Sequence, residues 1–213
     1  MTKTAIITGA SSGIGKAICG TLLTMDYEIY GIGRDFRDCG KLIGNSAFHK
    51  VELDLLINCA GVGFYGLHDE ISSADLSEMV RTNLEVPIVL TNLLLKKLRE
   101  SKGTVINIAS VTASQNNPHG AAYGATKAGL LSFSRSLFDE VRKHGVKVTT
   151  ILPDMTDTNL YRNASFEASK DENARLLPQD VADAVRYVLE ADPHKVITEF
   201  TVRPQLHRIE KKD

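Results

Sequence analysis

The chain has 213 residues, of which 43% are hydrophobic and 24% charged, and its formal net charge is -1 at pH 7. This length and composition suit one globular domain, the near-neutral charge excludes the footprint of a nucleic-acid-binding protein, and the most apolar run, Val86–Leu95, is too short to span a membrane. Three cysteines without a CxxC spacing predict free thiols in a reducing, cytoplasmic compartment, and the six scattered histidines predict no metal site.

The N-terminal segment predicts a strand, a glycine-rich turn and a helix, in that order. Thr4–Thr8 is a short run of apolar and β-branched residues, and a helical pattern opens at Lys16. Between them, the turn from Gly9 to Gly15 reads Gly-Ala-Ser-Ser-Gly-Ile-Gly. Gly9 permits a tight turn, while Gly13 and Gly15 let the backbone approach a phosphate where a Cβ would clash. The following helix N-terminus offers free N–H groups to a pyrophosphate, so this segment predicts a dinucleotide site.

The residues after the second predicted strand, Glu28–Ile32, bear on the choice of coenzyme. Gly33 occupies the place where an NAD enzyme usually has an acid for the ribose 2′-hydroxyl, and Arg34 lies next to it. An arginine fork matches phosphate geometry, so we favour NADP over NAD. NAD stays open as an alternative, because a small backbone shift would give Asp35 the role of the acid, and Gly-Arg-Asp is also an ordinary turn.

Two strand patterns, Ala47–Leu53 and the run that begins at Leu55, are separated only by Asp54. Adjacent parallel strands need a crossover of a dozen or more residues. Either one strand has been lost, or a crossover segment is missing from this sequence. We favour a missing segment because both patterns are intact, and this predicts a break in the chain near Asp54. The second run ends in the small residues of Asn58–Gly61, which leave room for a cofactor at the carboxyl edge of the sheet.

A helical pattern runs from about residue 73 to about residue 98, with Ser72 or Ser73 as its N-cap. Asn83 lies inside this pattern, four residues before Pro87. Proline removes a helical hydrogen bond, so we expect a non-standard backbone or side-chain arrangement at Asn83.

The next strand, Gly103–Ala109, ends at Ser110, and the helix predicted over Ala121–His144 carries Tyr123 and Lys127. Positions i and i+4 share a helix face, so these two side chains project together. A free phenol, with a pKa of roughly 10, is a poor acid or base near neutrality. We expect the Lys127 ammonium to lower the pKa of Tyr123 and to fit it for moving a proton to or from a carbinol oxygen. Taken alone, the pair more often marks an ordinary surface helix, and Ser110 an ordinary turn serine.

The C-terminal third predicts a strand over Val146–Leu152, a helix from Pro178 to about Glu190 and a last strand over Val196–Val202. The segment 154–175 is polar with little periodicity, and a loop this long predicts a substrate-binding loop or lid. The charged tail from His207 to Asp213 is predicted to fray. Because strands alternate with helices throughout, we expect an α/β fold with a doubly wound parallel sheet, helices on both faces and a single domain, 1–213.

The motifs together resemble the short-chain dehydrogenase/reductase family over nearly the whole chain. The matching pieces are Thr8 to Gly15, Asn58 to Gly61, Asn83, Ser110, Tyr123 with Lys127, and Pro153 with Thr158. The resemblance implies a Rossmann-type fold and an NAD(P)-dependent oxidoreductase that interconverts a carbonyl and an alcohol. It also implies a homodimer or homotetramer, because the family often assembles through the helix that bears Tyr123.

The resemblance assigns four catalytic residues. Tyr123 is the general acid in carbonyl reduction and the base in the reverse reaction. Lys127 lowers the pKa of this phenol and binds the nicotinamide ribose. Ser110 hydrogen-bonds the substrate oxygen, and Asn83 holds a water that continues the proton relay.

The resemblance also assigns a coenzyme site, in which Asp54 contacts the adenine and Thr158 the nicotinamide carboxamide. The chain departs from the family pattern at Asp154, where a glycine usually follows Pro153, and at the crossover missing after Asp54. The predicted cofactor-binding set is Gly9, Ser11, Ser12, Gly13, Ile14, Gly15, Arg34, Asp54, Asn58, Ala60, Gly61, Tyr123, Lys127, Pro153, Thr156 and Thr158.

The leading hypothesis is an NADP-dependent reductase of a small or medium carbonyl compound. One rival is a non-catalytic dinucleotide-sensing protein, which would be expected to lack the Tyr/Lys pair that this chain keeps. A second rival is a sugar-nucleotide epimerase or dehydratase, which usually needs a substantial further C-terminal region. The sequence does not name the substrate, although Phe64, Tyr65, Tyr161 and Phe166 are candidates to line its pocket.

Overall fold

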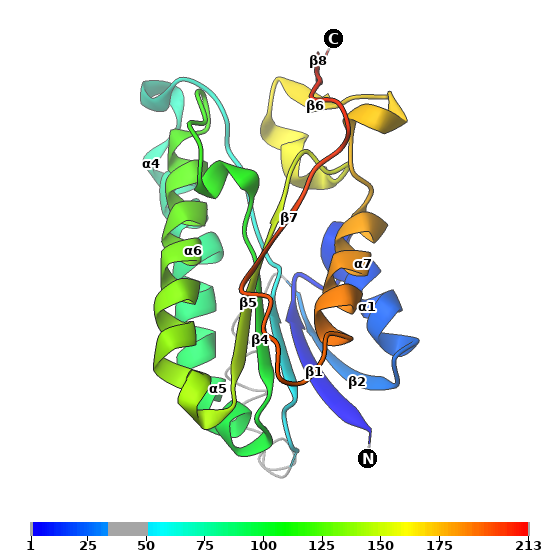
Figure 1. The fold of residues 1–213 in the computed structure, drawn as a ribbon. Helices are drawn as coiled ribbons and strands as arrows, with labels where there is room; N and C mark the ends of the chain where they lie inside the picture. Colours follow the sequence, from blue (N-terminus) through cyan, green and yellow to red (C-terminus); the bar gives the residue numbers. More distant parts are fainter. Residues whose placement is uncertain (1, 34–50, 213) are drawn as a thin grey trace.

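A sheet of six parallel strands runs through the centre of the protein, in the order β2-β1-β3-β4-β5-β7. The computed structural model describes residues 2–33 and 51–212 (Figure 1). From β1 the chain steps outward to β2, then returns to the other side of β1 and continues through β3 to β7, which confirms the doubly wound fold. The strands are β1 (Lys3–Thr8), β2 (Tyr27–Ile32), β3 (Leu55–Asn58), β4 (Thr104–Ile108), β5 (Lys147–Pro153) and β7 (Glu199–Val202).

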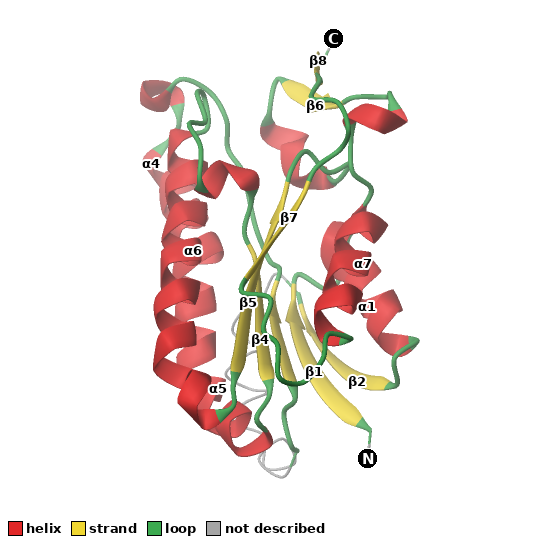
Figure 2. Cartoon of the chain, viewed as in Figure 1, coloured by secondary structure: helices red, strands yellow, loops and turns green. Residues whose placement is uncertain are grey.

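Helices cover both faces of this sheet, as Figure 2 shows. Successive residues of a strand point to opposite faces of the sheet. Because both faces are covered, the strands are apolar at successive positions. Ile6 and Leu56 pack into the core under α5 and α6, whereas their neighbours Ile7 and Ile57 pack under α1 and α7. No helix within the described ranges has the length and apolar character to cross a membrane. The helices are α1 (Gly13–Leu23) and α7 (Pro178–Leu189) on one face, and α4 (Ser73–Val80), α5 (Val86–Ser101) and α6 (Ala121–Val141) on the other.

The chain runs from Val51 through Asp54 directly into β3, and the choice between a lost strand and a missing crossover segment stays a prediction. Residues 51–53 form no strand, and residues 47–50 lie outside the described ranges. Asp54 sits at the amino edge of the sheet. Its backbone N–H donates to Thr4 O at 3.0 Å, its Oδ2 accepts from the Thr4 N–H at 2.8 Å, and its carbonyl accepts from the Thr104 N–H at 2.8 Å. Residues 51–53, the described end of the segment predicted as a separate strand, therefore lead straight into β3.

A π-helical turn over Arg81–Glu85 joins α4 to α5 and contains Asn83. Pro87 lies in the first turn of α5 and has no N–H to give to the carbonyl four residues earlier, which is that of Asn83. The non-standard backbone predicted at Asn83 is thus confirmed, and such turns are frequent at functional sites. The predicted cap is also confirmed, because Ser72 Oγ accepts from the Asp75 N–H at 3.1 Å.

The segment 154–175 contains a short strand, β6 (Phe166–Ala168), which pairs antiparallel with β8 (Ile209–Lys211) near the C-terminus. Figure 1 shows this pair at the carboxyl end of the sheet. Lys212 Nζ adds a bond to Tyr161 O at 2.6 Å. The prediction that the tail frays is therefore wrong for residues 209–211, because the backbone pairing and these polar contacts hold the tail on the loop.

Gly9→Ala should destabilise the fold. Gly9 has a φ of 72°, and an added Cβ would lie 2.9 Å from Ala60 Cα. We expect a loss of about 1–3 kcal/mol in the free energy of unfolding, measured by urea titration. The matched control is Gly20→Ala inside α1, where an added Cβ would meet nothing within 4 Å. That variant should be unchanged or more stable by roughly 0.5–1 kcal/mol, so equal losses in the two variants would contradict the strain at Gly9.

Candidate active site

A cleft of about 300 Å³ opens at the carboxyl ends of the parallel strands. It lies beside the point where the strand order reverses, between β1 and β3, which is where ligands bind in open α/β sheets. Its walls come from the turns after β1, β3, β4 and β5 and from the first turns of α6. The predicted site residues that line it are Gly9, Ser11, Ser12, Gly13, Ile14, Gly15, Ala60, Gly61, Ser110, Tyr123, Lys127, Pro153, Thr156 and Thr158.

The glycine turn forms one end of the cleft. A Cβ at Gly15 would overlap the carbonyl of Gly9, so only glycine permits this packing of α1 against the turn. Ser12 caps α1 without a side-chain hydrogen bond, which leaves N–H groups of the first helical turn for an anion. Thr8 Oγ1 accepts from the backbone N–H groups of Cys59 at 3.0 Å and Ala60 at 3.1 Å, which fixes the next turn beside it. The geometry fits a dinucleotide pyrophosphate.

Lys127 is buried at the other end of the cleft, with 4% of its surface exposed. Its Nζ donates to the Ile108 carbonyl at 3.0 Å and lies 5.7 Å from the centre of the Tyr123 ring. Burial lowers the pKa of Lys127 to about 8, and the nearby Cys59 opposes this shift. Burial also raises the pKa of the Cys59 thiol to about 12, so this thiol is no nucleophile near neutrality.

Tyr123 is equally buried, with 5% of its surface exposed. Burial raises the pKa of its phenol above the ordinary 10.0, because a phenolate loses its hydration there. The expectation that Lys127 lowers this pKa is therefore not met in this structure, since burial dominates and the ammonium bonds to a backbone carbonyl. Hydrogen bonds with Ser110 and Tyr65 lower the pKa of the phenol in part.

Ser110 lies at the end of β4, beside Tyr123. Its Oγ accepts from the Thr112 N–H at 3.2 Å and from the Thr112 hydroxyl at 3.0 Å. These two bonds orient the Ser110 oxygen and leave its own proton to donate. Ser110 also shares a hydrogen bond with the Tyr123 phenol, in which it would be the donor once Tyr123 is a phenolate.

Asn83 does not line the cleft but holds one of its walls. Its Oδ1 accepts from the Val62 N–H and its Nδ2 donates to the Val62 carbonyl, both at 2.9 Å. The same Nδ2 donates to Thr126 Oγ1 at 3.2 Å. A Cβ added at Gly61 would lie 3.6 Å from both Asn83 Oδ1 and Lys127 Nζ, so the two side chains converge over this glycine.

Two predicted cofactor residues within the described ranges lie away from the cleft. Asn58 is buried, and its Nδ2 donates to Asn107 Oδ1 at 2.8 Å and Thr91 Oγ1 at 3.3 Å, so it braces β3 instead. Asp54 lies at the opposite, amino edge of the sheet, because it immediately precedes Leu55, the first residue of β3. Both assignments are corrected here. Arg34 lies outside the described residues.

The cleft has further lining residues that the motifs did not identify. Asp154 was noticed only as a departure from the family pattern. Its carboxylate lies 3.9 Å from Arg203 Nε and 4.0 Å from His207 Nδ1, two residues that follow β7. The others carry no sequence signal, because their place depends on how distant segments meet. The residues concerned are Val62, Glu78, Thr82, Ile108, Ala109, Asp154, Asn159, Leu160 and Arg162.

The sequence pattern of the family described as short chain dehydrogenase matches residues 34–168. The chain belongs to this family. An uncharacterized oxidoreductase of Staphylococcus haemolyticus is 31% identical over 228 residues, which cover 95% of this chain and 97% of that protein. One from Staphylococcus aureus strain MW2 is 32% identical with the same coverage. The chain is thus a member of a dehydrogenase family, and both of these relatives are named oxidoreductases.

Solved structures of dehydrogenases share the whole fold of this family member. An alcohol dehydrogenase from Thermococcus sibiricus, complexed with 5-hydroxy-NADP, has a TM-score of 0.85 at 22% identity and covers 97% of this chain and 98% of its own. A 4-hydroxyisoleucine dehydrogenase complexed with NADH has a TM-score of 0.78 at 23% identity and covers 95% and 97%. These likenesses confirm the predicted Rossmann-type architecture.

The burial of Lys127 predicts a pH-dependent contribution to stability. An unfolded lysine titrates near 10.5 and the folded one near 8, so between these values the unfolded chain binds more protons and stability rises with pH. From pH 7 to pH 9, the unfolding free energy of the wild type should gain about 1 kcal/mol relative to Lys127→Met. Urea titrations at both pH values measure this, with the exposed Lys143→Met as a control for lost charge. A constant difference, or one that shifts toward the variant, would contradict the buried ammonium.

Proposed function

We propose that this protein interconverts a carbonyl and an alcohol by hydride transfer with NADP(H), and that Tyr123 is its general acid and base. One observation carries the proposal. The hydroxyl of Ser110, the phenol of Tyr123 and the ammonium of Lys127 meet at the carboxyl end of β4, in the same cleft as the glycine turn. A binding protein would have no use for a buried phenol flanked by hydroxyl donors and a cation.

The chemistry divides between coenzyme and protein. When bound, the dinucleotide supplies or accepts the hydride, and the protein supplies orientation and a proton. The N-terminus of α1 would hold the pyrophosphate, and Lys127 would bind the nicotinamide ribose hydroxyls. Thr158, which lines the cleft, would hold the carboxamide. Ser110 and Tyr123 would donate to the carbonyl oxygen as negative charge grows on it.

The protonation states suit the reductive direction near neutral pH. Burial keeps the Tyr123 phenol protonated, so it is ready to donate. Lys127, with a pKa of about 8, is mostly charged at pH 7 and would stabilise the phenolate left after the proton moves. The reverse reaction needs a phenolate as base, so alcohol oxidation should accelerate as pH rises.

The coenzyme preference and the setting belong to the same proposal. We favour NADP(H) because Arg34 follows Gly33, a residue that lines the cleft, and a guanidinium suits a 2′-phosphate. The solved relatives do not decide this point, since one contains 5-hydroxy-NADP and the other NADH. We further propose a cytoplasmic homodimer or homotetramer whose segment 154–175 serves as the substrate loop.

Tyr123→Phe should abolish turnover without abolishing coenzyme binding. The variant keeps the ring and loses the proton donor, so kcat for carbonyl reduction should fall by about 10²–10⁴-fold. The NADPH dissociation constant, followed by fluorescence titration, should stay within a few-fold of the wild-type value. Tyr187→Phe, on the exposed side of α7, is the matched control and should keep its activity. Near-normal turnover in Tyr123→Phe would refute the proposed role.

The substrate class is found by following NADPH and NADH oxidation over aldehydes, keto acids, ketoesters, quinones and steroids. Arg34→Ala should raise the KM for NADPH by roughly 10–100-fold and leave the KM for NADH nearly unchanged, because only NADPH carries the 2′-phosphate. Equal changes for both coenzymes, or a wild-type enzyme that prefers NADH, would argue against the NADP assignment.

A further inference from the structure

Tyr65 lies beside the catalytic phenol, on the loop that follows β3. Its ring centre is 5.5 Å from that of Tyr123, and the two ring planes are inclined by 47°. The hydrogen bond between the two side chains lowers the pKa of Tyr123 and raises that of Tyr65. Once Tyr123 gives up its proton, only the Tyr65 hydroxyl can donate in this hydrogen bond, and the Tyr123 oxygen accepts.

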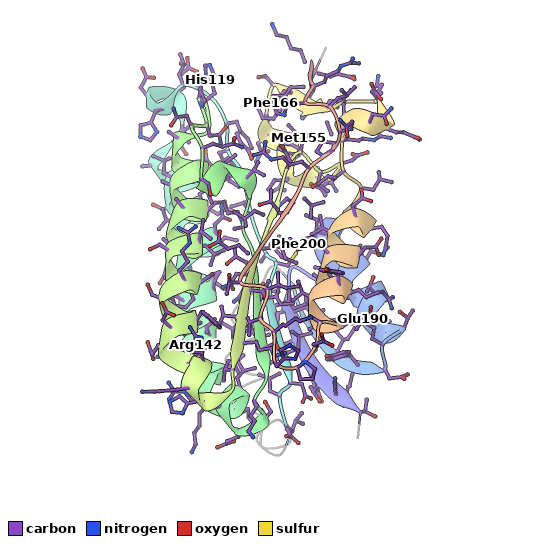
Figure 3. The ribbon with its side chains drawn as sticks, viewed as in Figure 1. His119, Arg142, Met155, Phe166, Glu190 and Phe200 are labelled. Atoms are coloured by element: carbon purple, nitrogen blue, oxygen red, sulfur yellow. The ribbon has the colours of Figure 1, made fainter. Side chains whose placement is uncertain are left out.

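The loop that carries Tyr65 is fixed at both ends. Asn83 holds the N–H and the carbonyl of Val62, each at 2.9 Å. The Gly66 N–H donates to the carbonyl of His119 at 2.8 Å, and His119 lies at the top of the α6 side in Figure 3. Only three residues separate these anchors. The position of the Tyr65 backbone is therefore set by the same Asn83 that converges with Lys127 over Gly61.

Gly63 provides the space that the Tyr65 ring occupies. A Cβ added at Gly63 would lie 2.6 Å from Tyr65 Cε2 and 2.9 Å from its hydroxyl oxygen. The phenol thus folds back over its own loop, with its hydroxyl end above a residue that has no side chain. Any larger residue at position 63 would displace the hydroxyl.

Aromatic rings from the substrate loop close the other side of Tyr65. Its ring centre lies 5.1 Å from that of Phe166, edge to face, and 5.9 Å from that of Tyr161. Phe166 belongs to β6, in the upper segment of Figure 3. Burial in this cluster raises the pKa of Tyr65 well above 10.0. Its hydroxyl therefore stays protonated, and remains a donor, over the working range of pH.

We propose that Tyr65 is a positioning residue, whose hydroxyl orients the Tyr123 oxygen and stabilises the phenolate that forms when Tyr123 gives up its proton. This inference rests on the proposed function of Tyr123. In carbonyl reduction, the O–H bond of Tyr123 breaks and its proton moves to the substrate oxygen. The electron pair stays on the Tyr123 oxygen, which accepts hydrogen bonds from Tyr65 and Ser110. Tyr65 loses no proton.

Tyr65→Phe tests the proposal because it keeps the ring and removes only the hydroxyl. In alcohol oxidation, kcat should rise with pH as Tyr123 loses its proton. In Tyr65→Phe this rise should occur about 0.5–1 pH unit higher than in the wild type, which is the effect of one lost hydrogen bond. At pH values below this rise, kcat should be about 3–10-fold lower than in the wild type, as such a shift requires. The KM for NADP should not change, since Tyr65 does not line the coenzyme end of the cleft.

Two further variants separate this role from simple packing. Tyr161→Phe removes a phenol from the same ring cluster for which no hydrogen bond to Tyr123 is found among the described residues. Its pH profile should stay in place or move slightly downward. Gly63→Ala should reproduce the upward shift of the pH profile, although the Tyr65 hydroxyl is still present. In the double variant that combines Gly63→Ala with Tyr65→Phe, the profile should shift no further than in either single variant. If Tyr65→Phe fails to fold, Gly63→Ala provides the test.

A wild-type pH profile and kcat in Tyr65→Phe would overturn the proposal, as would an equal upward shift in Tyr161→Phe. These outcomes leave Tyr123 untouched. Failure of the proposed function gives a different result, in which Tyr123→Phe itself retains turnover.

Discussion

The Lys127 ammonium on the Ile108 carbonyl is the contact on which the site depends. It joins α6 to the carboxyl end of β4, two residues before Ser110. Because Tyr123 lies one helical turn before Lys127, fixing the ammonium also fixes the phenol over the strand end. The burial that makes this contact rigid lowers the pKa of Lys127 to about 8 and raises that of Tyr123. A charged donor and a neutral phenol are thereby kept close together near pH 7.

The rest of the cleft follows from the order of the parallel strands. The chain reverses its direction across the sheet between β1 and β3, which places the glycine turn beside the small residues after β3. Thr8 joins these two turns through hydrogen bonds to Cys59 and Ala60. On the opposite side, the antiparallel pair of β6 and β8 secures the segment 154–175, so a segment close to the C-terminus supports the aromatic cluster around Tyr65. The glycine turn is thus held by Thr8, whereas the aromatic cluster around Tyr65 is held by the pairing of β6 with β8.

The sequence predicted the features that depend on a local pattern of residues. It did not predict those that depend on contacts between segments far apart in the chain. Strands, helices and the Tyr123–Lys127 pair follow from periodicities of two and three to four residues, and the structure has them. The position of Asp54 depended on how few residues separate the predicted strand that ends at Leu53 from β3, and apolar patterns do not indicate how such a stretch folds. The pKa of Tyr123 depended on burial, which a helical spacing cannot show. Tyr65 was only one of four aromatic candidates, although its spacing from Gly63, in a loop after a strand, was a usable signal. The coenzyme end could not be judged at Arg34, which lies outside the described residues.

The central claim is that the Tyr123 phenol and the Lys127 ammonium face a nicotinamide ring whose pyrophosphate lies at the N-terminus of α1. The most direct test is a crystal structure of the protein with NADPH bound. We expect the nicotinamide ribose hydroxyls within hydrogen-bonding distance of both side chains and the pyrophosphate against the glycine turn. A coenzyme bound outside this cleft, or a nicotinamide ring that does not reach Tyr123, would contradict the claim.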